Sequence, residues 1–381
     1  MNVGIVCYAS VGGSGVVATE LASALAHRGH EVHVLSSEVP FRLRDEPRLT
    51  FHRVETPAYP LFREPQYVLS LANKIVQVSR AQALDIVHAH YAIPHAAAAY
   101  LACQIIADTH RPVPGIITTL HGTDITIVGS DPSYTETVAY CIGQSDAVTA
   151  VSDSLRADTY RALGVKVPID VVPNFLDCDR HQRRPSPELR EQLLRGADHL
   201  IVHMSNFRPV KRVDAVVEIF RRIRGRVNAR LLLVGDGPDA HLAQERLISA
   251  GLMGQAEFLG EQLDIVALLS VADLFLLPSS QESFGLAALE AMACEVPVIA
   301  SAVGGLPEVI EHGETGFLYP PEDLQAMADS AVRLLEDRAL HARIARTARA
   351  VVAERFCTGA VVPLYEACYR GLLAKMGREG V

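Results

Sequence analysis

The chain lacks a C-x-x-C pair, a strongly basic segment and any apolar run long enough to cross a bilayer. Its formal net charge at pH 7 is −9, which argues against a general surface for nucleic acid or anionic membrane. It also has no repeat of fixed period and no low-complexity tract. These absences favour an ordinary globular protein with neither a nucleic-acid nor a membrane partner.

The seven cysteines are scattered and mostly lie in apolar strand or helix patterns. Such positions are typical of buried free thiols in a reducing compartment. We therefore expect no disulfide framework, no metal site and no cofactor. The segment 1–8 has no basic stretch and leads directly into a strand-like pattern, so we expect a cytoplasmic enzyme.

With 381 residues, of which 49% are hydrophobic and 21% charged, the chain can form two domains with substantial cores. Apolar runs that alternate with helical patterns are typical of α/β domains with parallel sheets. The expected strands lie at 3–7, 31–35, 85–90, 115–120, 146–151, 200–204, 230–234, 273–277 and 296–300. The pattern breaks near Val172, and the polar segment that follows it is typical of a linker between the domains.

A glycine-rich turn follows the first expected strand. Gly13 and Gly15 open an Ala/Leu-rich helix, which completes a βαβ unit with the strand at 31–35. Together with Ala18, the two glycines satisfy the dinucleotide fingerprint, a weak motif on its own. The loop could hold the pyrophosphate of NAD, support the diphosphate of a sugar nucleotide, or simply permit a tight turn. An NAD-dependent oxidoreductase therefore stays open as an alternative.

Two glutamates bracket the expected helix that follows the strand at 273–277. Glu282 lies in the loop before this helix, and Glu290 lies one to two turns into it. Gly285 lets a ligand approach the helix start, where backbone N–H groups and the helix dipole favour an anion. The stretch predicts a phosphate-sized site whose carboxylates can accept hydrogen bonds from the hydroxyls of a sugar or ribose.

Two further strand ends carry polar groups. The loop 205–212 contains Arg208, Lys211 and Arg212, and loops at the carboxyl ends of parallel strands are where α/β sheets bind ligands. We therefore favour diphosphate binding there over a solvated basic helix cap. His121 ends another strand, where it could donate a hydrogen bond to a sugar hydroxyl or to a developing charge.

The Glu-x7-Glu pattern at 282–290, with Phe-Gly-Leu inside it, resembles the donor-site signature of the retaining, nucleotide-sugar-dependent glycosyltransferases of family 4. The resemblance implies the GT-B fold, with two Rossmann-like domains, an active-site cleft between them and a last helix that returns to the N-terminal domain. It places an acceptor domain at 1–173, a nucleotide-sugar donor domain at 174–359 and the returning helix at 360–381.

The resemblance also implies residue roles in the donor site. Glu282 would hold the hydroxyls of the donor sugar, Glu290 the ribose and Lys211 the diphosphate. Many relatives carry an arginine where this chain has Asn206, so the source of a second cation stays open. The implied donor-binding residues are Gly13, Asn206, Lys211, Arg212, Glu282, Phe284, Gly285, Leu286 and Glu290.

The strings at 7–20, 88–95, 118–124 and 205–212 narrow the resemblance to the family members that begin bacillithiol synthesis. They imply UDP-N-acetylglucosamine as donor, L-malate as acceptor and retention at the anomeric carbon. Malate is small and doubly negative, which suits the N–H groups of a helix start. The implied catalytic residues are His121, Lys211 and Glu282, and the implied acceptor-binding residues are Ser14, Tyr91 and Thr119.

The expected mechanism is a same-face displacement in which Lys211 and the helix start at 284–286 stabilise the departing diphosphate. The diphosphate oxygen takes the proton of the malate hydroxyl, so neither a protein nucleophile nor a metal is required. The alternatives are a family 4 enzyme with another acceptor, such as an inositol phosphate or a glycan, the NAD-dependent oxidoreductase, and a non-catalytic nucleotide-sugar sensor. The family also suggests a homodimer, although the sequence identifies no interface.

Overall fold

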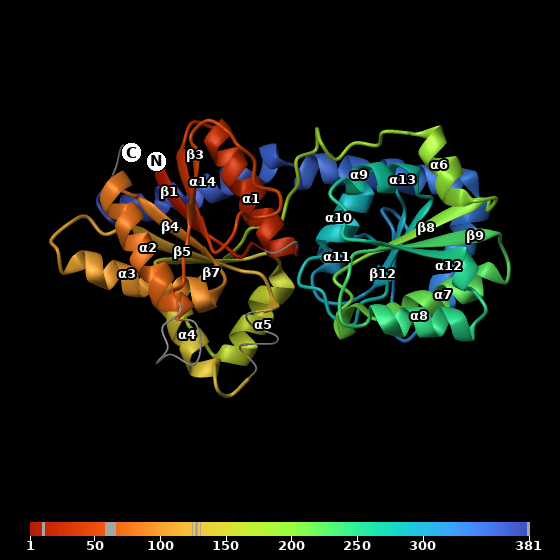
Figure 1. Ribbon diagram of the computed structural model, residues 1–381, viewed down its shortest axis with the longest axis horizontal. Helices are drawn as coiled ribbons and strands as arrows, with labels where there is room; N and C mark the ends of the chain where they lie inside the picture. Colours follow the sequence, from red (N-terminus) through yellow and green to blue (C-terminus); the bar gives the residue numbers. More distant parts are fainter. Residues whose placement is uncertain (10–11, 58–65, 124, 126–128, 130, 379–381) are drawn as a thin grey trace. The chain divides into compact units, whose positions relative to one another are not determined.

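The computed structural model describes all residues except 10–11, 58–65, 124, 126–128, 130 and 379–381. Its contacts divide the chain into two compact units, which are described separately. The first unit comprises Met1–Phe175 and Thr358–Val381, and the second comprises Leu176–Cys357. Figure 1 shows each unit as a twisted sheet with helices packed around it. Two α/β units with parallel sheets confirm the expected fold class.

The first unit contains a seven-stranded parallel sheet in the order β3-β2-β1-β4-β5-β6-β7. Its strands are β1 (Asn2–Val6), β2 (Glu31–Ser36), β3 (Leu49–Arg53), β4 (Ile86–His90), β5 (Gly115–Leu120), β6 (Ala147–Ala150) and β7 (Ile169–Val171). Its helices before the crossing to the second unit are α1 (Gly13–His27), α2 (Tyr67–Gln82), η1 (Ala92–Ala96), α3 (Ala97–Ala107), α4 (Thr135–Gly143) and α5 (Asp153–Leu163). The order reverses between β1 and β4, and such switch points are where α/β sheets bind ligands.

The second unit contains a six-stranded parallel sheet in the order β10-β9-β8-β11-β12-β13. Its strands are β8 (His199–Met204), β9 (Ala229–Val234), β10 (Ala256–Gly260), β11 (Leu274–Leu277), β12 (Val298–Ser301) and β13 (Phe317–Tyr319). Its helices are α6 (Pro187–Leu194), η3 (Pro209–Lys211), α7 (Val213–Arg224), α8 (Ala240–Ser249), η4 (Met253–Gln255), α9 (Ile265–Val271), α10 (Leu286–Ala293), α11 (Leu306–Val309), α12 (Leu324–Glu336) and α13 (Arg338–Arg355). The switch point lies between β8 and β11.

Local sequence explains these elements. Strand β9 is buried along its whole length, and all of its residues except Arg230 are apolar, as expected for a parallel strand covered on both faces. Helix α7 instead buries one stripe at three- and four-residue spacings. That stripe consists of Val213, Val216, Val217, Phe220 and Ile223. The core of the second unit therefore lies between its sheet and amphipathic helices such as α7.

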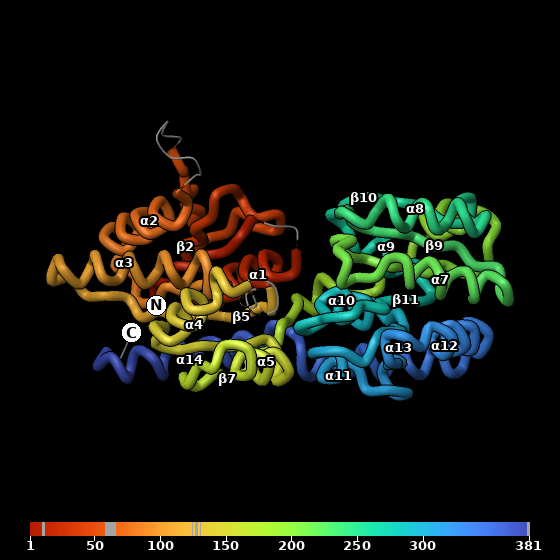
Figure 2. The backbone as a smooth tube through the Cα atoms, turned by 90° about the horizontal axis from the view of Figure 1, so that it is seen from below, coloured from red at the N-terminus to blue at the C-terminus, as the bar shows by residue number. Residues whose placement is uncertain are grey.

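The last helix, α14 (Thr358–Lys375), belongs to the first unit, which confirms the expected return. Figure 2 draws it in blue among the elements of that unit, and it packs against α1. Glu366 accepts hydrogen bonds of 2.7 and 2.8 Å from Arg28, the residue that follows α1. Gly115 of β5 leaves no room for a larger residue, because a Cβ atom there would lie 2.7 Å from Leu372 Cδ2. The returning helix is therefore an integral layer of the first unit.

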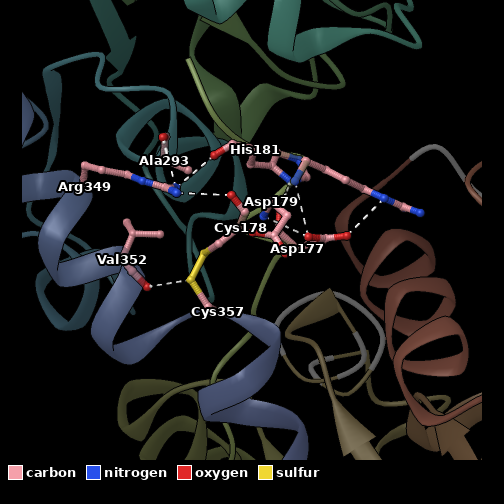
Figure 3. Close-up of a disulfide and its surroundings, with 9 residues drawn as sticks. Asp177, Cys178, Asp179, His181, Ala293, Arg349, Val352 and Cys357 are labelled. Atoms are coloured by element: carbon pink, nitrogen blue, oxygen red, sulfur yellow. Dashed lines mark hydrogen bonds and ion pairs between the residues drawn. A yellow bond between two sulfur atoms is a disulfide. The ribbon is translucent and has the colours of Figure 1, made fainter. Parts of the chain in front are cut away.

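The expectation that every cysteine is a free thiol is wrong. Cys178 and Cys357 form a disulfide, with their Cα atoms 5.5 Å apart and a separation of 179 positions in the sequence (Figure 3). Arg349 supports this region by donating hydrogen bonds to the carbonyl oxygens of Cys178, His181 and Ala293. Sequence spacing could not reveal the pair, because its members meet only where the chain enters and leaves the second unit.

The other five cysteines are free, and four of them are buried. Within the described ranges, no helix combines the length and apolar character needed to span a membrane.

Candidate functional site

Two loops of the second unit meet at its switch point. The loop after β8 carries Lys211, the loop after β11 carries Glu282, and the two strands are neighbours in the sheet. Ser280 ties the loops together by donating a backbone hydrogen bond of 2.8 Å to Val210 O. Residues separated by 71 positions in sequence thereby form an ion pair, with Lys211 Nζ 2.6 Å from Glu282 Oε1.

This ion pair is largely removed from solvent. The side chain of Glu282 is 9% exposed and that of Lys211 is 22% exposed. Glu282 Oε1 also accepts a hydrogen bond of 2.9 Å from Ser279 Oγ. A buried carboxylate needs such partners. Lys211 has three N–H donors, so it can hold Glu282 and a phosphate oxygen at once. The geometry brings the predicted diphosphate and sugar contacts together.

Glycines hold both loops in place by close backbone contact. Gly304, with φ +54°, lies so near the Glu282 loop that a Cβ atom would be 1.8 Å from Glu282 O. Gly305 donates a 3.0 Å hydrogen bond to the same oxygen. Gly235 makes a similarly close contact with the loop after β8, because a Cβ atom at Gly235 would lie 1.9 Å from Ser205 O. The sequence analysis does not identify the Gly304-Gly305 pair, although a glycine pair a few residues after the expected strand at 296–300 is a signal for it.

The start of α10 offers backbone groups rather than side chains. Its N-cap is Gly285, which has φ +95° and is pressed against Leu306. Phe284 is only 3% exposed, and its ring lies 5.8 Å from that of Phe356. The Phe284 side chain therefore belongs to the core, and any ligand contact from it would use the backbone. Leu286, the first helical residue, is partly exposed.

Glu290 lies inside α10 and is only 5% exposed, so it is not a solvated surface charge. Its Oε1 lies 3.8 Å from Nε2 of His181. The remaining predicted donor residues are nearer to solvent. Asn206 is exposed, whereas Arg212 turns away to donate a hydrogen bond of 2.5 Å to Pro321 O. The exposed Arg208 is thus the better source of a second cation.

In the first unit, Ser14 and Tyr91 meet at the switch point between β1 and β4. Tyr91 follows β4 with φ 103° and donates a 2.8 Å hydrogen bond from its hydroxyl to Ser14 Oγ. Ser14 lies in the first turn of α1, beside the exposed Gly13. A helix start with adjacent hydroxyls suits a small carboxylate. The structure therefore joins two of the predicted acceptor residues and Gly13 at one end of the sheet.

Thr119 differs from these acceptor residues because it is fully buried. Its hydroxyl lies 2.7 Å from both His88 Nε2 and Thr149 Oγ1. Its side chain is thus already engaged within the sheet. The prediction that Thr119 binds the acceptor remains untested, but the geometry favours support of His88 over direct contact.

A row of histidines lies beside Thr119. His88 and His90 project from one face of β4 and stack with ring centroids 4.4 Å apart, and His90 Nδ1 lies 2.9 Å from Nε2 of the partly exposed His121. Burial lowers the pKa of His88 to about 3, with a smaller contribution from His121. Burial likewise lowers the pKa of His121 to about 3 and that of His95 to about 4. These imidazoles are therefore neutral at pH 7.

Over the described part of the chain, no cluster of three or more His, Cys, Asp or Glu residues could hold a metal ion.

Two family models match the chain: Glycosyltransferase Family 4 over residues 11–180, and Glycosyl transferases group 1 over residues 186–351. The chain is 45% identical over 375 residues to the N-acetyl-alpha-D-glucosaminyl L-malate synthase of Bacillus anthracis, which covers 98% of this chain and 97% of the relative. It is 26% identical over 363 residues to the D-inositol 3-phosphate glycosyltransferase of Stackebrandtia nassauensis, with 88% and 81% covered.

A solved structure supports the fold. Anabaena Alr3699/HepE, crystallised with UDP-glucose, matches with a TM-score of 0.79 at 22% identity and covers 97% of this chain and 99% of its own.

Proposed function

Because this chain belongs to the family 4 glycosyltransferases, we propose that it transfers N-acetylglucosamine from UDP-N-acetylglucosamine to the hydroxyl of L-malate, with retention at the anomeric carbon. This reaction begins bacillithiol synthesis. The observation that carries the proposal is the likeness to the Bacillus anthracis enzyme over nearly the whole of both chains. The family membership expected from the Glu-x7-Glu pattern is confirmed.

In the proposed donor site, Lys211 stabilises the negative charge that develops on the departing diphosphate. Glu282 orients Lys211 through the 2.6 Å contact, and its carboxylate can also accept hydrogen bonds from the donor sugar. The N–H groups at the start of α10 add a second source of positive potential. Glu290 holds the ribose from the next turns of the same helix. These roles rest on the family resemblance and on the pairing of Lys211 with Glu282.

In the proposed acceptor site, the start of α1 and the hydroxyls of Ser14 and Tyr91 hold the malate carboxylates. His121 donates a hydrogen bond to the donor sugar. The malate hydroxyl attacks the anomeric carbon, its proton passes to the departing diphosphate oxygen, and the bond from the anomeric carbon to that oxygen breaks. No protein side chain becomes covalently attached.

A related acceptor is the second candidate. The Stackebrandtia nassauensis relative is named for D-inositol 3-phosphate, which is also a small anion. A helix start with adjacent hydroxyls would suit either molecule. The NAD-dependent oxidoreductase has no comparable support, because it gives the Lys211–Glu282 pair no role.

The test is UDP release from UDP-N-acetylglucosamine in the presence of EDTA, with L-malate, D-inositol 3-phosphate or no acceptor. Release that depends on malate supports the proposal. Release only with the inositol phosphate would keep the family and change the acceptor, whereas binding of UDP-sugar without release would indicate a sensor.

The cytoplasmic location and the homodimer stay predictions. The Cys178–Cys357 disulfide bears on the location, because disulfides seldom persist in reducing compartments.

A further inference from the structure

His90 is positioned between two other imidazoles. Its ring stacks on His88 at 4.4 Å and 28° and on His121 at 5.1 Å and 21°. His90 follows His88 by two residues on β4, so both point to the same face, and β5 ends one residue before His121. His90 Nδ1 lies 2.9 Å from His121 Nε2. The two rings are therefore joined by a direct hydrogen bond in which one nitrogen donates and the other accepts.

The residues around this pair fix its geometry. His88 is held at both ring nitrogens, with Nδ1 2.8 Å from the hydroxyl of Tyr369 on α14 and Nε2 2.7 Å from Thr119 Oγ1. His95 Nδ1 donates to the backbone oxygen of His90. The stack is thus held from β5, η1 and the returning helix.

Both rings of the hydrogen-bonded pair are neutral, because burial lowers the pKa of His90 and that of His121. Two arrangements of the shared hydrogen bond remain. Either His90 donates from Nδ1 to Nε2 of His121, or His121 donates from Nε2 to Nδ1 of His90. Because a neutral imidazole carries one proton, the second arrangement places the proton of His90 on its own Nε2.

The environment of His90 Nε2 distinguishes these arrangements. This atom is buried and has no hydrogen-bond partner among the described residues. An N–H group left there would lose its hydrogen bond to water without gaining an acceptor, and buried N–H groups without partners are rare in proteins. The arrangement in which His90 carries its proton on Nδ1 avoids this loss. It obliges His121 to accept at Nε2 and to carry its proton on Nδ1.

We propose that His90 is a positioning residue that holds His121 in the Nδ1–H tautomer, so that His121 acts as a hydrogen-bond donor from Nδ1. That His121 faces the donor sugar rests on the proposed function, whereas its tautomer does not. The chemical consequence is specific: Nε2 of His121 is committed to His90, and Nδ1 presents a proton rather than a lone pair.

The tautomer can be measured without substrate. In protein labelled with ¹⁵N-histidine, long-range ¹H–¹⁵N correlation spectra distinguish Nδ1–H from Nε2–H rings. The His121 signals are assigned as those absent from the His121→Gln variant. We expect the Nδ1–H pattern at pH 7. An Nε2–H pattern, an imidazolium or an even mixture of tautomers would overturn the proposal, whatever reaction the protein catalyses.

Two variants test the influence of His90. His90→Phe keeps an aromatic ring in the stack but removes the donor, so the His121 tautomers should mix and kcat should fall by about 10²-fold, with a smaller change in KM. His90→Asn replaces Nδ1–H with an amide N–H and should restore the Nδ1–H tautomer and most of kcat. A folded His90→Phe protein with the original tautomer and normal kcat would contradict the positioning role.

The chain offers a matched control. His33 and His52 form a similar imidazole pair, with His33 Nδ1 3.0 Å from His52 Nε2. This pair joins β2 and β3 at the edge of the same sheet. His33→Phe should leave kcat and the His121 tautomer unchanged. Equal loss of kcat in both Phe variants would show a general effect on the sheet and would refute the specific role of His90.

Discussion

The ion pair between Lys211 and Glu282 makes the sharpest prediction, because its two partners contribute differently to folding and to turnover. Removing the lysine leaves a carboxylate that is 9% exposed and that still accepts a hydrogen bond from the neutral Ser279. Breaking a fully buried ion pair typically costs about 3–5 kcal/mol, but Lys211 is 22% exposed and water can reach the vacated space. We therefore expect Lys211→Ala to lower the free energy of unfolding by about 1–3 kcal/mol.

The effect of Lys211→Ala on turnover should be larger. Loss of one well-placed charge-stabilising group typically lowers kcat by about 10²–10³-fold. The double variant Lys211→Ala/Glu282→Gln separates the two effects. Its neutral amide no longer needs a cation, so stability should recover towards the wild-type value while turnover stays low.

Denaturant unfolding and UDP release measure the two quantities on the same preparations. Arg226→Ala is the matched control, because it removes an ion pair with Asp329 in which both side chains are about half exposed. It should change stability by less than about 1 kcal/mol and leave turnover unaffected. Near-normal turnover in folded Lys211→Ala protein would refute the assigned role. A double variant no more stable than Lys211→Ala would refute the account of the buried carboxylate.

Three further predictions concern stability and loop geometry. His88 has its pKa lowered to about 3, so this ring alone should lower the free energy of unfolding by up to about 1.4 kcal/mol per pH unit as the pH drops below about 6.5. The other buried histidines add to the wild-type slope, so His88→Gln should show a shallower slope in unfolding measured from pH 7 to 4. Cys178→Ser should lower the free energy of unfolding by about 2–4 kcal/mol, and an unchanged denaturation midpoint would contradict this. Gly304→Ala would bring a methyl group 1.8 Å from the carbonyl oxygen of Glu282, so UDP affinity should fall at least about tenfold by calorimetry. Gly254→Ala, with open space around it, should not weaken UDP binding.

The strands that the sequence predicts are the interior ones. All nine expected strands correspond to interior strands of the two sheets, where burial on both faces favours a mostly apolar sequence. The four strands that were missed, β3, β7, β10 and β13, are the four sheet edges. Each of them contains partly exposed positions, so its apolar pattern is weaker. These four strands were therefore not predicted because they lie at the edges of the sheets.

That Lys211 and Glu282 lie at the same edge of the sheet could be predicted for a similar topological reason. Lys211 and Glu282 each follow an interior strand, and parallel strands gather such loops at one edge of the sheet. Their direct contact could not be predicted, because it requires β8 and β11 to be neighbours. The disulfide could not be predicted for the same reason. Cys178 and Cys357 are close only because the chain enters and leaves the second unit at neighbouring positions.

The histidines show a second limit, which concerns protonation rather than position. The spacing of His88 and His90 places both on one face of β4, and a pair of imidazoles without a third ligand is weak evidence for zinc. Whether those rings are charged depends on what covers them, and here α14 returns from the far end of the chain to place Tyr369 against His88. Burial keeps these imidazoles neutral. Because each neutral ring carries one proton, the hydrogen bond between His90 and His121 depends on which ring nitrogen carries it. The periodicity of the sequence thus predicts which face of a strand carries a histidine. Its protonation state and tautomer depend on the burial that the chain topology produces.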